Sequence, residues 1–163
     1  MPTYKNPVSV LVVIYTPDNQ FLLIERAAHP GYWQSVTGSQ ETGETIQTTA
    51  ARELAEETGL IAAATCQLTD VSPAQRLGVL IDHQHSTEYD IYPQWRHRYG
   101  PGVTRNTEHL FSFQIATPQT VELTPKEHRD QRWLGAEAAT KACFSPSNQV
   151  AISLLAKMNL SQN

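Results

Sequence analysis

The sequence has little of several features that would narrow its class. Its 163 residues include only two cysteines, Cys66 and Cys143. Two are too few for a disulfide framework or a four-ligand zinc site, so we interpret both as reduced thiols. No apolar run approaches the roughly 20 residues of a membrane span, and the first residues lack the layout of a signal peptide. These absences predict a soluble, cytoplasmic protein.

Charge is also sparse. Charged residues make up 17% of the chain, with a formal net charge of −4, and apolar residues make up 40%. This is not the composition of a disordered chain. The mild acidity argues against a nucleic-acid partner, because such binding depends on neutralising phosphates with Lys and Arg. A small polyphosphate bound through a metal ion remains compatible with it. The length predicts one domain over residues 1–163.

Several segments have the residue patterns of strands. Residues 8–15 form an uninterrupted, largely β-branched apolar run, typical of a strand covered on both faces. A turn signal at residues 16–19 joins it to a second strand at 21–25, which predicts a hairpin. Further strands are predicted at 33–37, near the end of 61–71, at 87–92 and at 109–115. Residues 96–107 contain Gly-Pro-Gly and are expected to form a loop at their centre.

The helix signals are fewer and clearer. Residues 45–58 lack Pro and Gly and are rich in helix-forming residues, and Gly59 fits a C-cap. A short helix is predicted at 136–142. Ser145 and Pro146 supply a capping side chain and a first-turn proline ahead of an amphipathic helix at 147–158. Strands and helices mixed in one chain predict an α/β sandwich.

The most informative segment is residues 38–60, GSQETGETIQTTAARELAEETGL. On a helical wheel with Ile46 as the origin, Glu57 falls at about 20° and Glu53 at about 340°. Ala50 and Leu54 mark the apolar stripe at about 40° and 80°. Two acidic residues therefore border the face that should pack on the sheet.

The spacing of the acids alone leaves two interpretations open. Glu53, Glu56 and Glu57 follow an i, i+3, i+4 pattern, so their carboxylates share one side of the helix and repel one another. The run is either a solvated acidic face, in which case the acids should lie opposite Leu54, or the binding site of a divalent cation. Oxygen ligands of this kind suit Mg²⁺ or Mn²⁺. Glu44 lies at the helix entrance, where negative charge is favourable.

The same segment resembles the Nudix box, GX5EX7REUXEEXGU, where U is aliphatic. The sequence has Gly38, five residues, Glu44, seven residues and then RELAEETGL over residues 52–60, so every fixed position matches. The resemblance implies a Nudix fold: an α/β/α sandwich with a mixed sheet and a loop-helix-loop catalytic motif. It also implies a Mg²⁺-dependent hydrolase of a nucleoside diphosphate linked to another group.

Further matches extend over nearly the whole chain, at residues 5–9, 33–38, 96–108 and 147–148. These segments resemble the branch of the family that removes pyrophosphate from a pterin triphosphate in folate biosynthesis, leaving a monophosphate. Residues 66–85 match least and are the candidate position of an insertion.

The resemblance implies roles for individual acids. Glu53 and Glu57 are the first metal ligands and Glu56 the third, with the backbone carbonyl of Gly38 near the metal because no side chain obstructs it. A further ligand is expected from Glu127, with Glu122 and Asp130 as the alternatives. Arg52 and Glu44 are expected to orient these ligands. The general base is open among Glu53, Glu56 and Glu127, because a bound metal already lowers the pKa of water.

Substrate contacts are expected mainly from a basic loop, although its residues alone favour an ordinary exposed loop. The resemblance favours polyphosphate binding, for which the planar guanidinium is suited. The loop residues are Arg96, His97, Arg98 and Arg105. The other residues implied to bind the substrate are Lys5, Arg26, Thr37, Tyr89, Asp90, Ile91, Tyr92 and Ser145. Tyr89 and Tyr92 also fit the core or edge of a strand.

Other conspicuous side chains have simpler interpretations. His83 and His85 are too isolated for a zinc site and are predicted to lie on the surface. Trp33, Trp95 and Trp133 are predicted to be packing residues, with Trp95 the most exposed.

The sequence is also compatible with other functions. Within the family these are hydrolysis of (d)NTPs or of oxidised nucleotides. Outside catalysis the chain could be a nucleotide-sensing domain, although such domains usually lose box carboxylates that this sequence retains. A protein-interaction domain with an acidic helix is a weaker alternative.

Overall fold

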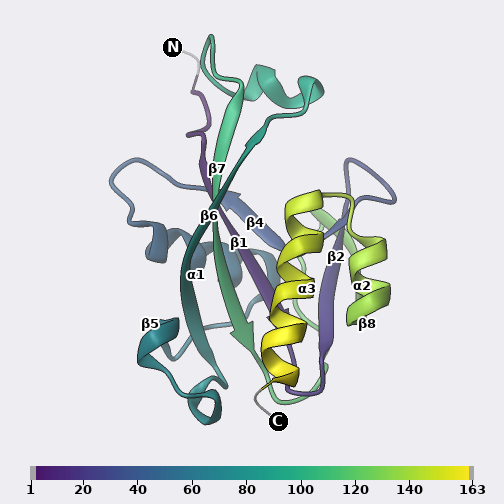
Figure 1. Ribbon diagram of the computed structural model, residues 1–163. Coiled ribbons are helices and arrows are strands. Elements are labelled where there is room, and N and C mark those ends of the chain that lie inside the picture. The colour runs from purple at the N-terminus through teal and green to yellow at the C-terminus, as the bar shows by residue number, and fades with distance from the viewer. Residues whose placement is uncertain (1–2, 162–163) are drawn as a thin grey trace.

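The computed structural model, which describes residues 3–161, is built around one mixed sheet (Figure 1). The strands follow the order β3-β2-β1-β7-β6-β5, with β4 also pairing with β1 and β8 with β2. β1 is parallel to β7 and β5 to β6, whereas the other pairs are antiparallel. The bounds are β1 Val8–Tyr15, β2 Gln20–Arg26, β3 Trp33–Gln34, β4 Val36–Ser39, β5 Ala64–Gln67, β6 Val79–Asp90, β7 Arg105–Gln114 and β8 His128–Gly135.

Helices cover both faces of this sheet. Helix α1 (Ile46–Thr58) packs on one face, and α2 (Ala136–Ala142) and α3 (Pro146–Leu160) pack on the other. Strand β1 serves both layers, because alternate side chains of a strand point to opposite faces. Leu11 belongs to the core under α2 and α3, and Val10 belongs to the core under α1. The predicted α/β/α sandwich with a mixed sheet is confirmed.

The helix boundaries follow the predicted signals closely. Thr45 precedes α1, and its hydroxyl accepts the backbone N–H of Thr48 at 3.1 Å. The helix ends at Gly59, whose φ of 76° is the left-handed conformation that glycine adopts without strain. Pro146 lies in the first turn of α3, as predicted. The cap expected from Ser145 is wrong, because its hydroxyl contacts Ser147 Oγ at 3.0 Å instead of capping the helix.

The strand predictions needed more correction. The hairpin of β1 and β2 is confirmed. The strand predicted at 33–37 is two strands, because the chain pairs first with β2 and then with β1. The strand predicted near the end of 61–71 lies in the middle, as β5. β6 begins at Val79, well before 87, and a register shift between Asp82 and Ser86 obscures its alternation. Strand β8 was not predicted.

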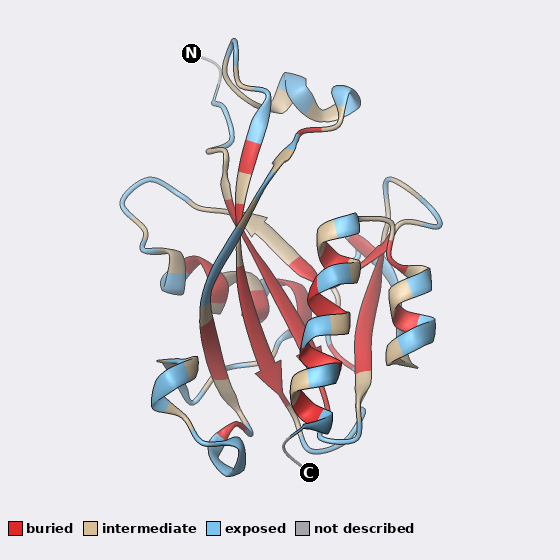
Figure 2. Ribbon diagram, viewed as in Figure 1, coloured by how far each residue is buried: buried red, intermediate tan, exposed pale blue. Residues whose placement is uncertain are grey.

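The middle of the chain contains no inserted layer. Residues 66–85 form the end of β5, two short 3₁₀ helices (Leu68–Asp70 and Pro73–Gln75) and the start of β6. The predicted loop at 96–107 begins within a 3₁₀ helix over Pro93–Arg98 and turns at Gly102, with φ of 80°. Figure 2 shows buried residues concentrated in the central strands, whereas the second half of β6 is exposed or half-buried. Over residues 3–161 no helix has the length and apolar character that crossing a membrane requires.

The cysteines and tryptophans behave as predicted, and one histidine does not. Cys66 and Cys143 are both free thiols. Trp33 is buried, with the Arg132 guanidinium 4.5 Å from the centre of its ring. His83 is half-buried, and its Nε2 lies 2.7 Å from Ser112 Oγ, so its predicted surface position is wrong. The cause is that β6 already runs beside β7 at this point.

Trp133 and His85 also lie as predicted. Trp133 is half-buried, and its Nε1 donates to the carbonyl of Gln119 at 2.8 Å, which fits a packing role. His85 is exposed, as predicted.

Candidate active site

Helix α1 carries its acids at three different depths. Glu57 is only 2% exposed, Glu53 is mostly buried, and the side chain of Glu56 is 56% exposed. This gradient follows the helical wheel, which placed Glu57 and Glu53 beside the apolar stripe. A solvated acidic face is therefore wrong as a description of this helix. A buried carboxylate needs a compensating partner, because removing its charge from water is costly.

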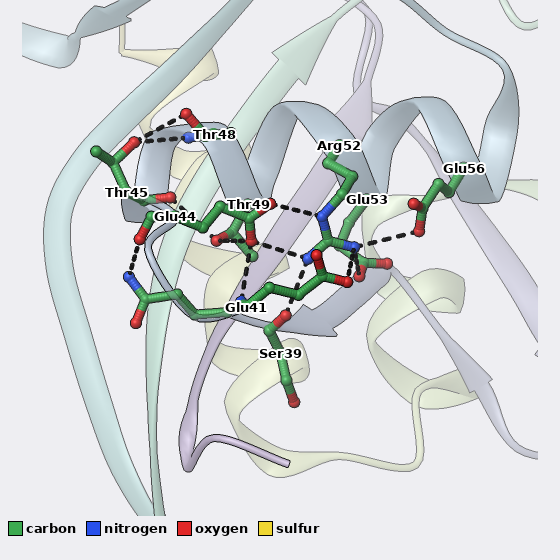
Figure 3. Close-up of polar contacts among 10 residues, drawn as sticks. Ser39, Glu41, Glu44, Thr45, Thr48, Thr49, Arg52, Glu53 and Glu56 are labelled. Carbon is green, nitrogen blue, oxygen red and sulfur yellow. Dashed lines mark hydrogen bonds and ion pairs between the residues drawn. The ribbon is translucent and has the colours of Figure 1, made fainter. Parts of the chain in front are cut away.

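Arg52 forms hydrogen bonds with acids of both the preceding loop and the helix (Figure 3). Its Nε donates to Glu44 Oε2 at 2.7 Å, and its Nη2 donates to Glu44 Oε1 at 2.9 Å and to the Ser39 carbonyl at 3.0 Å. Its Nη1 donates to Glu53 Oε1 at 2.7 Å. A bidentate pair of this kind fixes geometry as well as charge. The resulting arrangement holds Glu53 in place.

Glu44 is the anchor of the loop that precedes the helix. Besides Arg52, its Oε1 accepts the hydroxyl of Thr49 at 2.7 Å and the backbone N–H of Glu41 at 3.0 Å. The Arg52 hydrogen bonds, followed in size by the opposing effect of burial, bring the pKa of Glu44 to about 2. Glu44 is therefore charged at neutral pH. Its contacts orient Arg52 and the loop, which is the positioning role expected for it.

The carboxyl groups of Glu53 and Glu57 lie against each other. Burial, and then the neighbouring charge of Glu53, raise the pKa of Glu57 well above its ordinary value. The Oε1 atom of Glu57 is buried and has no hydrogen-bond partner. His128 Nε2 lies 3.6 Å from that oxygen, but burial and the charge of Arg26 lower the pKa of His128 to about 4. The imidazole is therefore neutral at pH 7 and does not offset the acid.

Gly38 is needed for a reason that the sequence did not reveal. A β carbon at this position would lie 2.0 Å from Cδ of Glu53, well inside contact distance. The space that a side chain would fill is occupied by the Glu53 carboxyl group, which packs directly on the backbone of β4. Gly38 therefore allows the close approach of loop and helix that brings Glu53 to Glu57.

These acids suit a hard divalent cation that takes its remaining ligands from water and from the substrate. Within residues 3–161, no three Asp, Glu, His or Cys side chains converge as a complete cation cage. Arg52 holds Glu53, and Glu56 extends toward solvent. Mg²⁺ typically takes only one or two carboxylates from a protein and fills its other positions with water and substrate phosphate oxygens. The unpaired oxygen of Glu57 beside Glu53 suits such an ion.

The acids face a cleft of about 1280 Å³. The residues that line this cleft come from segments along most of the chain. Glu127 reaches it from the loop before β8, where its carbonyl accepts the backbone N–H of Ala27 at 2.9 Å. The negative charge of Glu127 also contributes to the raised pKa of Glu57. The alternatives Glu122 and Asp130 are exposed and do not line the cleft. Glu127 is thus the acid that the structure brings to Glu57.

Three cationic side chains meet at the same end of the cleft. They are Lys5 of the N-terminal segment, Arg26 of β2 and Arg98 of the 3₁₀ helix. The backbone N–H of Lys5 donates to the backbone carbonyl of Arg98 at 2.8 Å, which holds the two segments together. Burial, then the charges of Arg98 and Arg26, lower the pKa of Lys5, and the charges of Glu53 and Glu127 raise it. Cations and acids therefore act on one another here, as a site for a metal-bound polyphosphate requires.

The rest of the predicted basic loop stays outside the cleft. Arg96 is exposed, and its Nε donates to the carbonyl of Ile91 at 3.0 Å. Arg105 forms ion pairs with Glu88 at 3.5 Å and with Asp90 at 3.4 Å. Neither Arg96 nor Arg105 lines the cleft, and the same holds for His97. Their partners Ile91 and Asp90 do line the cleft, so the substrate contacts expected of Arg96 and Arg105 stay a prediction.

Most other predicted substrate residues do line the cleft. They are Thr37, Tyr89, Asp90, Ile91, Tyr92 and Ser145. Trp95 lies among them, with its ring 5.3 Å from Tyr92 and 6.0 Å from Phe144 between centroids. The Arg26 guanidinium lies 4.7 Å from the Trp95 ring centre. Trp95 is therefore half-buried in an aromatic wall that also positions a cation.

Sequence reasoning missed the polar residues deeper in the cleft. These are Ser9, Asn106, Glu108, Ser147 and Asn148. Asn148 bridges to β3 and β4 through Ser35, accepting its N–H at 2.8 Å and donating to its hydroxyl at 3.0 Å. Asn106 and Glu108 stand two residues apart, a spacing that puts both on one face of a strand. They were missed because β7 was predicted to begin only at residue 109.

Comparison with known proteins identifies the class. The NUDIX domain family model matches residues 5–155, and the chain therefore belongs to the Nudix family and is a Nudix hydrolase. Enzymes of this family act on small phosphate compounds and generally use a divalent metal ion. A likeness to solved structures at lower identity supports the fold alone: a NUDIX hydrolase from Listeria monocytogenes covers 96% of this chain and 97% of its own, at a TM-score of 0.71 and 23% identity.

More similar relatives are particular enzymes. Dihydroneopterin triphosphate diphosphatase of Escherichia coli K12 is 45% identical over 150 residues, which are 91% of each chain. The enzyme of the same name from Haemophilus influenzae is 39% identical over 153 residues, 93% of this chain and 89% of its own. The structure of the E. coli dihydroneopterin triphosphate pyrophosphohydrolase superposes with a TM-score of 0.79 at 40% identity, covering 94% of this chain and 97% of that one.

Proposed function

We propose that this protein is a Mg²⁺-dependent pyrophosphohydrolase that converts dihydroneopterin triphosphate to dihydroneopterin monophosphate and pyrophosphate. The 45% identity to enzymes of that name supports the substrate. The observation that carries the chemistry is the buried, unpaired oxygen of Glu57 beside Glu53, in a cleft shared with Lys5, Arg26 and Arg98. Such a site can bind a cation and the polyphosphate that accompanies it.

The metal-binding part of the proposal rests on the acids at one end of the cleft. Glu53 and Glu57 are its main ligands, Glu56 and Glu127 are the additional acids, and Gly38 offers a backbone carbonyl. All are oxygen donors, which favours Mg²⁺ and permits Mn²⁺. When bound, such an ion lowers the pKa of water and offsets charge on the phosphates.

The protein's own side chains supply position and charge. Arg52 and Glu44 hold Glu53, and Lys5, Arg26 and Arg98 bind phosphate oxygens. A water molecule attacks a phosphorus of the triphosphate, the P–O bond to the pyrophosphate portion breaks, and a carboxylate of Glu53, Glu56 or Glu127 takes the proton from the water. Positioning and electrostatic stabilisation account for most of the rate in phosphoryl transfer.

The other end of the cleft would hold the pterin ring. Ser145 and residues 89–92, which line the cleft, would contact it there, and Thr37 would contact it from beside Glu57, to which its backbone is hydrogen-bonded. Tyr92, Trp95 and Phe144, which pack edge to face, supply aromatic surface there. Flat rings bind well against such surfaces, since aromatic contacts combine large area with fixed geometry.

We also propose that residues 1–163 act as one Nudix domain in the cytoplasm. The family match over residues 5–155 supports the first point. The two free thiols support the second, because cytosolic conditions keep cysteines reduced.

An activity panel tests the proposed function. Dihydroneopterin triphosphate, the eight common (d)NTPs and 8-oxo-dGTP are supplied with Mg²⁺, and orthophosphate and pyrophosphate are assayed separately. We expect the highest kcat/KM for the pterin, with pyrophosphate as the product. A higher kcat/KM for any nucleotide contradicts the pterin assignment, and release of orthophosphate contradicts the position of cleavage.

A further inference from the structure

The deep part of the cleft is a polar pocket built on one face of the sheet. Asn106 and Glu108 of β7 share that face, since they are two residues apart. Glu108 is in register with Ser9 of the parallel strand β1, and Asn106 with Tyr89 of β6. The start of α3 covers this face and adds Ser147, which also lines the cleft. Regular elements therefore supply all members of the pocket.

Glu108 is a buried acid with little compensation from the protein. It is 7% exposed, and its Oε1 accepts the hydroxyl of Ser147 at 2.8 Å. Burial raises the pKa of Glu108, and the Ser147 bond lowers it in part. Within residues 3–161, no donor is hydrogen-bonded to Oε2. A buried carboxylate with one unused oxygen that lines a cleft is suited to receive donors from a ligand.

Asn106 provides an independent sign of the same kind. It is 1% exposed, and its Nδ2 donates to Ser9 Oγ at 2.7 Å and to the hydroxyl of Tyr89 at 3.0 Å. Its Oδ1 is buried and has no partner. Buried polar atoms are nearly always hydrogen-bonded in folded proteins. Glu108 and Asn106 thus place two acceptor oxygens without a hydrogen-bond partner side by side in this part of the molecule.

Unsatisfied acceptors select a ligand that carries N–H donors. The 2-amino-4-oxo ring of a pterin has an amide N–H and an amino N–H side by side on one edge. A carboxylate accepts two such parallel bonds, as it does from a guanidinium. Guanine has the same edge, whereas hypoxanthine lacks the amino group and adenine lacks the amide N–H. A site that recognises this edge would therefore distinguish pterin and guanine from hypoxanthine and adenine.

We propose that Glu108 determines ring specificity by accepting the paired N–H groups of a 2-amino-4-oxo heterocycle, with Ser147 positioning its carboxylate and Asn106 accepting a further donor. The proposal rests on the proposed function, because it places the ring of the substrate in the cleft whose other end carries Glu57. It adds the specificity determinant to that site. In chain order, β5 and β6 separate Glu108 on β7 from helix α1. Glu108 takes no part in the hydrogen-bond network that joins Arg52 to the acids of α1.

The test is the isosteric variant Glu108→Gln, with Glu88→Gln as the control. Glu88 is an exposed acid of the adjacent strand that does not line the cleft, so the same chemical change there leaves ring selection intact. We compare kcat and KM for dihydroneopterin triphosphate, GTP and ITP, which differs from GTP only by the missing amino group. The wild type and the control are expected to prefer GTP over ITP about tenfold. Glu108→Gln removes this preference and raises KM for the pterin by about 10- to 100-fold.

Binding of neopterin, which carries no phosphate, separates this proposal from the proposed function. Titration followed by pterin fluorescence needs neither metal nor hydrolysis. We expect the wild type to bind neopterin and Glu108→Gln to lose at least tenfold in affinity, about one good hydrogen-bonded pair. Ser147→Ala, which leaves the acid in place, is expected to show a smaller loss in the same direction.

The possible failures are distinguishable. If the wild type hydrolyses none of the triphosphates, the proposed function fails, and neopterin affinity still decides the role of Glu108. If Glu108→Gln folds and keeps both the GTP preference and wild-type affinity for neopterin, the role assigned to Glu108 is wrong. Should that variant not fold, unchanged affinity in Ser147→Ala overturns the role of the Glu108–Ser147 pair.

Discussion

Glu57 Oε1 and His128 Nε2 lie 3.6 Å apart in the interior, and neither group compensates the other. Burial is the largest cause of both shifts: it raises the pKa of Glu57 and lowers that of His128 to about 4. An acid and a base that meet as an ion pair would shift in the opposite directions. Glu57 therefore gains no ion pair from His128, and a divalent cation bound beside it would favour its charged form.

Glu57→Gln tests this binding directly. The change keeps the size of the side chain and removes a buried charge that lacks a partner. We expect kcat to fall by orders of magnitude, because a metal ligand is lost. Without metal, the Tm should stay the same or rise, since the charge is costly to bury. Near-normal turnover in this variant would show that Glu57 is not a ligand. Glu137→Gln, an exposed acid of α2, is the control.

Metal binding should also stabilise the fold. A ligand at 100 times its Kd adds about 2.7 kcal/mol to the free energy of unfolding. We expect Mg²⁺ to raise the Tm of the wild type in a concentration-dependent manner, and Glu57→Gln to abolish most of this increase. Thermal melts at several Mg²⁺ concentrations measure it, with K⁺ salts at matched ionic strength as the control. A variant that responds to Mg²⁺ like the wild type places the ion elsewhere.

We expect Gly38→Ala to lower activity by displacing the carboxyl group of Glu53. The added methyl group would lie 2.0 Å from Cδ of Glu53 and must displace that carboxyl group. A shift of about 1 Å in a catalytic group typically reduces rates by about 100-fold, so kcat should fall by 10- to 100-fold. Gly135→Ala is the matched control, because nothing lies within 4 Å of its β carbon. Equal activity of the two variants contradicts the close packing of Glu53 on β4.

His83 should make the fold sensitive to acid. Burial, then the charge of Arg76, lower its pKa to about 4 from an ordinary value of 6.5. The unfolded chain therefore takes up the proton first as the pH falls, and the native state loses on the order of 2 kcal/mol between pH 6.5 and 4. Urea unfolding across this range should show a flatter pH profile for His83→Gln than for the wild type. His85→Gln, at an exposed position, should retain the wild-type slope.

The sequence predicted the layers of the fold because its strongest patterns are local. The apolar run of β1, the caps of α1 and the short α2 all depend on neighbouring residues. The helical wheel also placed Glu53 and Glu57 at the packing face without any structure. By contrast, β8 has no regular alternation in its sequence and forms by pairing with β2. Such an edge strand is specified by its partner, which local patterns do not reveal.

The sequence by itself determined how the acids Glu53, Glu56 and Glu57 are spaced along one helix and which of them lie beside its packing face. Tertiary structure decided which cations join them: Lys5, Arg26 and Arg98 converge, whereas Arg96 and Arg105 bind other partners. It also decided that Glu108 and Asn106 lie at the bottom of the same cleft. The physical reason is range. Helical spacing fixes neighbours within a few residues, but strand pairing and burial bring together groups about 100 positions apart, such as Ser9 and Asn106.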